Sequence, residues 1–129
     1  MERNLRVLVV DDEPDILETL EFSLSRRGFE VATAVDGLEG LEKAKRMPPD
    51  FMILDVMLPG KSGFDILREL RDIPETTDLP VLILTAKGQG RDREMAERFG
   101  VTRFMTKPFA NSEVLETVNA MQADAVGDA

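Results

Sequence analysis

The sequence predicts an α/β fold: a doubly wound, five-stranded parallel sheet with helices on both faces. Apolar runs of strand length alternate with helical patterns five times along the 129 residues. The runs are almost uniformly apolar, which is typical of strands covered on both faces. Strands that are separated by helices need right-handed crossovers, and such crossovers make neighbouring strands parallel.

Five short runs are the expected strands. They are Leu5–Val10, Glu30–Ala34, Phe51–Leu54, Val81–Leu84 and Phe104–Thr106. All but the second stop at reactive polar residues, whereas the second ends in Ala34-Val35. A doubly wound sheet binds its ligand at the carboxyl ends of its strands, near the point where the strand order switches. This contrast predicts the order 2-1-3-4-5, as in flavodoxin-like (βα)5 folds, with the second strand at a remote edge.

Apolar residues at helical spacing mark the segments between the strands. The first helix is expected to begin at Pro14, which suits the first helical position, and to end at Arg26, before Gly28. The later helices are expected around Leu38–Lys45, Phe64–Leu70, Met95–Phe99 and Glu113–Met121. We expect one domain over residues 1–121 and a frayed, small and polar tail over residues 122–129.

The composition excludes several classes of site. The chain has no Cys and no His, which rules out a disulfide, a thiolate metal site and a Ser-His-Asp type triad. A formal net charge of −9 argues against nucleic-acid binding as the main activity. The apolar runs are far shorter than a membrane span, and no apolar signal segment follows Met1. We therefore expect no membrane contact and a cytoplasmic location.

Reactive side chains stand where four of the runs end. Asp11 and Asp12 follow the first run, Asp55 the third, Thr85 the fourth and Lys107 the fifth. Because the carboxyl ends of parallel strands meet at one edge of the sheet, three carboxylates, a hydroxyl and an ammonium should share one small site. The carboxylates and the ammonium leave two negative charges, which one divalent cation would cancel. The site suits such a cation and a phosphoryl group.

Repulsion within this cluster should strain the protein when no metal is bound. Two like charges about 4 Å apart repel by about 4 kcal/mol at an effective dielectric constant of about 20, as an upper guide. Asp12→Ala should therefore raise the melting temperature in metal-free buffer and weaken Mg²⁺ binding.

Four motifs in this order resemble the receiver domain of a two-component response regulator, of the stand-alone chemotaxis type. The motifs are Asp11-Asp12, Asp55 with Met57-Leu58-Pro59-Gly60 and Gly63, Thr85-Ala86, and Lys107-Pro108-Phe109. Each motif alone is weak, but the ordered set is specific, and the resemblance covers residues 5–121. It implies a phosphorylation-activated signalling switch that takes part in its own phosphorylation and dephosphorylation and is not otherwise an enzyme.

The resemblance also implies a role for each acidic residue. Asp55 is the phosphoacceptor, which holds the phosphoryl group as an acyl phosphate. Asp12, Asp55 and the backbone carbonyl of Met57 bind Mg²⁺ or Mn²⁺ directly, and Asp11 acts largely through water. The acids at the start of the first helix would also interact favourably with its dipole, and both roles can hold together.

Four further residues complete the implied site. Lys107 pairs with the acceptor and later with a phosphoryl oxygen, and its bond to the following proline is typically cis in this family. Thr85 binds another phosphoryl oxygen, and Ala86 is small enough to leave room for the phosphate. Thr85 and Phe104 resemble the pair whose movement changes the surface of the fourth helix, fifth strand and fifth helix. A plain core role for Phe104 stays open.

The implied partners are proteins. The donor is a sensor histidine kinase or a histidine phosphotransfer protein, whose phosphohistidine supplies the residue type that this chain lacks. The downstream protein target is unknown. The last helix, Glu113–Met121, has no Arg or Lys, unlike the charged dimer face of DNA-binding winged-helix regulators. We therefore expect a monomer when the protein is unphosphorylated, and no direct contact with nucleic acid.

Three alternatives stay open at this point. The chain could be a receiver module cut from a larger regulator, which nothing in the sequence excludes. A haloacid-dehalogenase-like phosphatase would also use an aspartyl nucleophile, but it needs a second Asp where Met57 stands, and it needs a cap domain. A flavodoxin-like cofactor carrier needs a glycine-rich phosphate loop where Asp11-Asp12-Glu13-Pro14 would repel an anion.

Overall fold

The computed structural model describes residues 5–86, 94, 97–98 and 100–127. All strands of its sheet run parallel, in the order β2-β1-β3-β4-β5. The strands are β1 (Arg6–Val10), β2 (Glu30–Ala34), β3 (Phe51–Asp55), β4 (Val81–Ala86) and β5 (Arg103–Lys107). The predicted fold class and strand order are confirmed.

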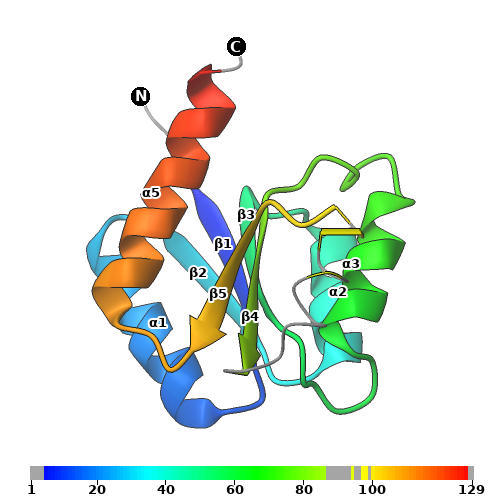
Figure 1. Cartoon of the computed structure of the whole chain (residues 1–129), viewed down its shortest axis with the longest axis horizontal. Helices are drawn as coiled ribbons and strands as arrows, with labels where there is room; N and C mark the ends of the chain where they lie inside the picture. The colour runs from blue at the N-terminus through cyan, green and yellow to red at the C-terminus, as the bar shows by residue number, and fades with distance from the viewer. Residues whose placement is uncertain (1–4, 87–93, 95–96, 99, 128–129) are drawn as a thin grey trace.

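Helices cover both faces of the sheet. They are α1 (Pro14–Arg26), α2 (Gly37–Arg46), α3 (Gly63–Arg71) and α5 (Asn111–Gly127). Figure 1 shows α1 and α5 on one face and α2 and α3 on the other. In the segment expected to form the fourth helix, Glu94, Glu97 and Arg98 are helical, whereas Met95, Ala96 and Phe99 lie outside the described residues. No helix in the described part of the chain is both long and apolar enough to cross a membrane.

The last helix extends further than the sequence predicted. It was expected to end at Met121, with a frayed tail after it, but α5 continues to Gly127. This expectation was wrong for residues 122–127, because Gln122 and the alanines that follow favour the helix and contain no helix breaker before Gly127. Figure 1 shows the final turns of α5 projecting beyond the sheet.

Alternation along the strands divides the core into two layers. In β1, Val7 and Val9 pack with residues of α1 and α5, while Leu8 and Val10 pack with residues of α2 and α3. Successive side chains of a strand point to opposite faces, so an apolar strand supplies both layers. Burying each such side chain stabilises the fold by about 1.5–3 kcal/mol.

Local signals set where the helices begin after the strands. Pro14 opens α1 directly after the acidic turn. The carboxylate of Asp36 caps α2 by accepting a hydrogen bond from the Glu39 N–H at 2.8 Å. The Ser62 hydroxyl caps α3 by accepting one from the Asp65 N–H at 3.2 Å. Each cap satisfies a backbone N–H of the first helical turn and so helps to fix where the helix begins.

Candidate functional site

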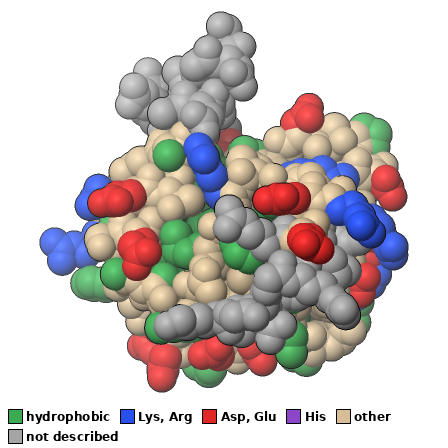
Figure 2. Space-filling view, in the orientation of Figure 1, with side chains coloured by type: hydrophobic (Ala, Val, Ile, Leu, Met, Phe, Trp, Pro, Cys, Tyr) green, Lys and Arg blue, Asp and Glu red, His purple; other side chains and the backbone are tan. Residues whose placement is uncertain are grey.

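The predicted site residues meet at the carboxyl edge of the sheet. Asp55 and Lys107 are the last residues of β3 and β5. Asp11 continues the β1 ladder by one residue, since its N–H donates to the Ala34 carbonyl at 3.1 Å. Figure 2 shows acidic side chains gathered at the lower edge of the molecule, which is where the strands end in Figure 1.

Strand alternation explains which of these side chains meet. Asp11 has the same parity as Val9, Asp55 the same as Ile53, and Lys107 the same as Met105. Those three apolar residues belong to the core layer under α1 and α5. The two carboxylates and the ammonium therefore share one side of the sheet at its edge.

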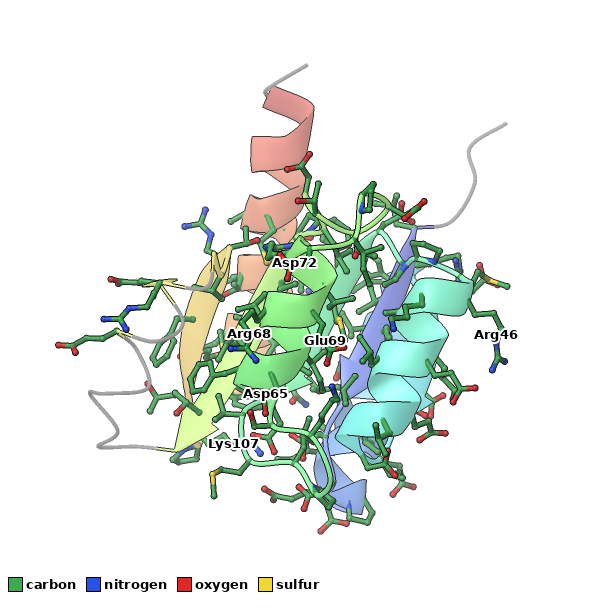
Figure 3. All side chains as sticks on the ribbon, turned by 90° about the vertical axis from the view of Figure 1, so that its right-hand side faces the viewer. Arg46, Asp65, Arg68, Glu69, Asp72 and Lys107 are labelled. Atoms are coloured by element: carbon green, nitrogen blue, oxygen red, sulfur yellow. The ribbon has the colours of Figure 1, made fainter. Side chains whose placement is uncertain are left out.

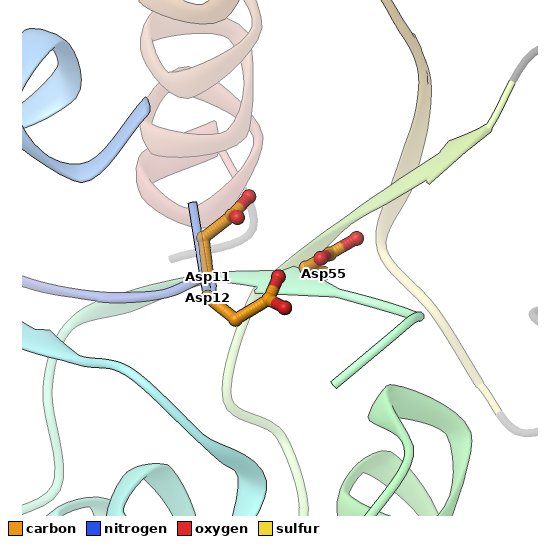
Figure 4. A group of neighbouring side chains, drawn as sticks. All are labelled: Asp11, Asp12 and Asp55. Carbon is orange, nitrogen blue, oxygen red and sulfur yellow. The ribbon is translucent and has the colours of Figure 1, made fainter. Parts of the chain in front are cut away.

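Three carboxylates form a compact cluster. Asp11, Asp12 and Asp55 each offer an oxygen, and these oxygens lie within 4.8 Å of one another. Figure 4 shows Asp11 and Asp12 beyond the end of β1 and Asp55 at the end of the neighbouring strand β3. Asp11 is fully buried and Asp55 is 3% exposed, whereas Asp12 is exposed. Carboxylate oxygens at this spacing are ligands that Mg²⁺ prefers, and the exposure of Asp12 leaves room for water on the ion.

Lys107 lies beside the two buried carboxylates of this cluster. Its Nζ lies 3.0 Å from Asp11 Oδ2 and 3.4 Å from Asp55 Oδ2. It also lies 3.0 Å from Glu13 Oε1, to which it donates a hydrogen bond. The count of charges from sequence omitted Glu13. Lys107 pairs with three carboxylates, and when Asp12 is included the four carboxylates and the ammonium leave three negative charges. The only signal for Glu13 was its place in the acidic turn before Pro14.

Burial shifts the ionisation of the two inner carboxylates. Loss of hydration raises the pKa of Asp55 to about 6, and repulsion from Asp11 adds to the rise, although Lys107 and the Met57 N–H oppose it. Burial likewise raises the pKa of Asp11, against the Glu13 N–H, which donates to Asp11 Oδ1 at 2.9 Å, and against Lys107. The metal-free site thus disfavours full ionisation.

The same burial acts on the ammonium but is outweighed. Loss of hydration by itself lowers the pKa of Lys107, yet Glu13, Asp11 and Asp55 together raise it above its usual value. Lys107 is therefore charged at every pH at which the fold is normally studied.

The structure changes where the strain of the cluster lies. The sequence placed it on Asp12, whose removal was expected to raise the melting temperature. Because Asp12 is exposed while Asp55 and Asp11 are buried, the strain falls on those two carboxylates instead. An exposed charge keeps most of its hydration, so its removal relieves little repulsion.

Thr85 lies near the acceptor but on the other side of the sheet. It is fully buried and follows Leu84, the register partner of Asp55. Its own register partner is Thr106, and Phe104 pairs with Ile83. Alternation therefore puts Thr85 and Phe104 on the same face as diagonal neighbours. Phe104 is half-buried against the core layer under α2 and α3.

Ala86 and Met57 are the remaining predicted residues of the site. Ala86 pairs with Lys107 in the sheet, but its side chain lies outside what the structure describes. The Met57 side chain is 71% exposed, and its backbone N–H is directed at the Asp55 carboxylate. The Lys107-Pro108 peptide bond is cis.

Comparison with known families identifies the family to which the chain belongs. The sequence profile described as the response regulator receiver domain matches residues 7–119. The chain belongs to the response regulator receiver family. Receivers are signalling modules of two-component systems, and phosphorylation and Mg²⁺ binding are typical of this family.

Named receivers resemble it in sequence and in structure. The alkaline phosphatase synthesis transcriptional regulatory protein PhoP of Bacillus subtilis is 42% identical over 118 residues, which are 92% of this chain and 48% of PhoP. The chemotaxis protein CheY4 of Vibrio cholerae superposes with a TM-score of 0.87 at 31% identity, covering 92% of this chain and 99% of that one.

A further structure contains a metal ion. The receiver domain of the sensor histidine kinase PA1611 from Pseudomonas aeruginosa has a magnesium ion coordinated in its active site cleft. It superposes with a TM-score of 0.84 at 27% identity, covering 92% of this chain and 98% of that one. The receiver described here spans about half the length of the curated relatives it matches.

Proposed function

We propose that this receiver is a phosphorylation-activated switch in which Asp55 accepts the phosphoryl group. The observation that carries the proposal is the position of Asp55, a buried carboxylate 3.4 Å from an ammonium and within 4.8 Å of two further carboxylates. A carboxylate beside one cation and a cation-binding cluster can approach an anionic phosphoryl group, which an isolated carboxylate would repel.

The residues of the chain have separate parts in the transfer. An oxygen of Asp55 forms a bond to phosphorus while the bond from phosphorus to the donor's imidazole nitrogen breaks, and that nitrogen keeps the electron pair. Lys107 already lies between Asp55 and Asp11, so its ammonium can turn to an equatorial phosphoryl oxygen. Thr85, at the end of β4, donates its hydroxyl hydrogen to another.

The carboxylate cluster fits Mg²⁺ or Mn²⁺. Asp11 Oδ2 is buried and lies 3.0 Å from the Lys107 ammonium, but it accepts no hydrogen bond of good geometry among the described residues, so a water molecule on a bound cation could donate to it. Asp12, Asp55 and the Met57 carbonyl would hold the ion directly, and Asp11 largely through water. When bound, the ion supplies positive charge that offsets the phosphoryl oxygens. The magnesium ion in the PA1611 receiver supports this assignment.

Asp12 should control metal affinity without controlling the metal-free fold. Saturating Mg²⁺ at about one hundred times its dissociation constant should stabilise the wild type by about 2.7 kcal/mol. Asp12→Asn should lose most of this gain, while its melting temperature in EDTA stays within about 2 °C of the wild type. Melting curves with and without Mg²⁺ check this. If the melting temperature of Asp12→Asn in EDTA were many degrees above that of the wild type, the strain of the metal-free cluster would lie at Asp12 after all.

The partners follow from the same chemistry. The donor is the phosphohistidine of a sensor histidine kinase or a histidine phosphotransfer protein, and the output acts on a protein target in the cytoplasm. We propose that residues 1–121 form the receiver and that it is a monomer when unphosphorylated, without direct contact to nucleic acid. Because the curated relatives are about twice as long, a receiver that belongs to a larger regulator is equally compatible with this role.

The output is a change of the surface formed by the fourth helix, β5 and α5. Thr85 and Phe104 share one face of neighbouring strands, so movement of Thr85 toward the phosphoryl group leaves space that the Phe104 ring can enter. Phosphorylation must favour the active arrangement by about 5.5 kcal/mol to move its population from about 1% to about 99%.

Removing the ring should separate phosphorylation from output. Phe104→Ala should accept the phosphoryl group at the wild-type rate, because the ring lies outside the acidic cluster, but it should lose the phosphorylation-dependent change in partner binding. Mass spectrometry follows the first property and a pull-down with and without beryllofluoride follows the second. An unchanged pull-down would remove Phe104 from the switch.

Labelling with a small phosphoryl donor tests the proposed function. Acetyl phosphate with Mg²⁺ should add one phosphoryl group per chain, and reduction of the acyl phosphate with borohydride should mark Asp55. Asp55→Asn should stay unlabelled, whereas Asp15→Asn, a matched change in the first turn of α1, should be labelled normally. Labelling elsewhere, or steady release of phosphate from repeated turnover, would contradict the proposal.

A further inference from the structure

The loop between β3 and α3, residues 56–62, is fastened to both helices on its side of the sheet. We propose that Lys61, Glu69 and Gly37 are positioning residues that set the affinity of the receiver for its metal ion by holding this loop. The inference rests on the proposed metal site, since the loop carries the Met57 carbonyl.

The first fastening is an ion pair to α3. The Lys61 ammonium donates a hydrogen bond to the Glu69 carboxylate, and both side chains are about a third exposed. Figure 3 shows Glu69 on the side of α3 toward α2, whereas Arg68 and Asp65 lie on its other side. Lys61 thus reaches from the end of the loop to the second turn of α3, the helix that follows the loop.

The second fastening is a close approach of α2. The Gly37 N–H donates to the Pro59 carbonyl at 3.4 Å. A Cβ on Gly37 would lie 2.2 Å from the Lys61 carbonyl oxygen and 3.0 Å from a methyl carbon of Ile66. The Gly37 backbone is ordinary helix, so glycine is needed here for space and not for a special φ. The first turn of α2 therefore rests directly on the backbone of the loop.

The near end of the loop is held by its own backbone. The N–H groups of Leu58 and Gly63 both donate to the Val56 carbonyl, at 3.1 and 3.0 Å. A Cβ on Gly63 would lie 2.3 Å from the Asp55 carbonyl oxygen, so the loop closes tightly over the end of β3. Its two ends are therefore fixed at β3 and α3, and its middle is fixed at α2.

Met57 depends on these fastenings for its position. Its side chain is 71% exposed and does not anchor it, yet its N–H is directed at Asp55 and its carbonyl is a proposed metal ligand. A shift of the loop by a few tenths of an ångström would move both groups. Mg²⁺ demands near-ideal octahedral geometry, so such a shift weakens binding.

The pair is suited to a clean test because it should contribute little to stability. An ion pair this exposed contributes about 0–1 kcal/mol, so removing it should leave the fold intact. Lys61→Gln and Glu69→Gln change the net charge in opposite directions. If the two variants acted through charge alone, Lys61→Gln would tighten Mg²⁺ binding and Glu69→Gln would weaken it. Acting through the loop, both would weaken it.

We expect each variant to bind Mg²⁺ about tenfold more weakly by calorimetry, at the lower end of what outer-shell partners of metal ligands contribute. Arg68→Gln and Asp65→Asn are the matched controls, since they make the same charge changes in the neighbouring exposed pair on α3 and should differ from the wild type by less than about twofold. The double exchange Lys61→Glu with Glu69→Lys should restore part of the affinity.

Gly37→Ala provides a variant without any change of charge. Its Cβ should displace the loop and weaken Mg²⁺ binding by at least as much as Lys61→Gln, with the melting temperature in EDTA reporting any loss of fold. Opposite changes in affinity for Lys61→Gln and Glu69→Gln, or wild-type affinity in both, would overturn the inference while the metal site stands. Failure of the wild type itself to bind Mg²⁺ would overturn the proposed metal site as well.

Discussion

Asp55→Asn should stabilise the metal-free protein at pH 7 by about 3 kcal/mol, which raises the melting temperature by roughly 10 °C in a domain of this size. The fold raises the pKa of Asp55 from 3.8 to about 6, because burial and Asp11 disfavour its charge. At pH 7 the wild type must hold that charge in a place where the neutral acid is preferred. Asparagine has nearly the same shape and carries no charge, so the cost is removed.

The sign of the pH dependence follows from the same shift. Below about pH 4, Asp55 is protonated in both the folded and the unfolded chain, and the wild type should approach the stability of the variant. As the pH rises from about 4 to about 6, the unfolded chain releases this proton first. The wild type therefore loses stability over this window relative to Asp55→Asn, and the difference is constant above it.

Urea unfolding of the wild type and of Asp55→Asn in EDTA, from about pH 3.5 to about pH 8, measures this difference in the free energy of unfolding, and this range brackets the shifted pKa of Asp55. Asp15→Asn, in the first turn of α1, is a control for a change of net charge. Mg²⁺ should close the gap, since a bound cation favours the ionised wild type. A gap that is absent at pH 7, or that widens as the pH falls, would contradict the burial of a strained charge at Asp55.

Lys107→Gln should have the opposite effect on the metal-free protein. The ammonium lies within 3.0 Å of Asp11 and Glu13 and 3.4 Å of Asp55, and its side chain is only 17% exposed. Removing it leaves a fully buried Asp11 and a nearly buried Asp55 without their cation. Breaking a buried pair in this way costs about 3–5 kcal/mol, and the partial exposure here reduces the expected loss to about 2–3 kcal/mol.

Metal should compensate for the missing ammonium. With Lys107 gone, the carboxylates attract a cation more strongly, so Lys107→Gln should bind Mg²⁺ more tightly than the wild type and should gain more in melting temperature from it. Lys45→Gln, an exposed change of equal charge on α2, is the control. The raised pKa of Lys107 keeps the ammonium's contribution present at neutral pH, and it should be lost only in strong alkali. Equal Mg²⁺ affinity in both proteins would show that Lys107 does not share the site with the metal.

The sequence predicted the sheet because its signals are local and periodic. Uniformly apolar runs such as Phe51–Leu54 mark strands with two covered faces, and the polar residue at the end of each run marks the carboxyl edge. The alternation of side chains along each strand can also be read from the sequence, and it accounts for Asp11, Asp55 and Lys107 facing one another.

Other features of the site could not be predicted in this way. Nothing in the sequence separates an exposed Asp12 from a fully buried Asp11 beside it. Glu13 stands in a turn whose direction depends on α1 packing against the sheet, and only that packing brings it to Lys107. The continuation of α5 past Met121 was missed because Gln122 and the alanines after it were taken as a small, polar tail although they also favour a helix.

The strands, the edge at which the site lies and the residue types that meet there could thus be predicted from the chain alone, because each run and the polar residue after it form a local pattern. The strand order followed from comparing the ends of the five runs. The burial and pairing of Asp11, Asp12, Glu13 and Asp55, and the contacts of Gly37 and Glu69 with the loop beyond Asp55, came from the three-dimensional packing. Burial and distance across elements set the free energy of a charge, and neither is encoded at a single position in the chain.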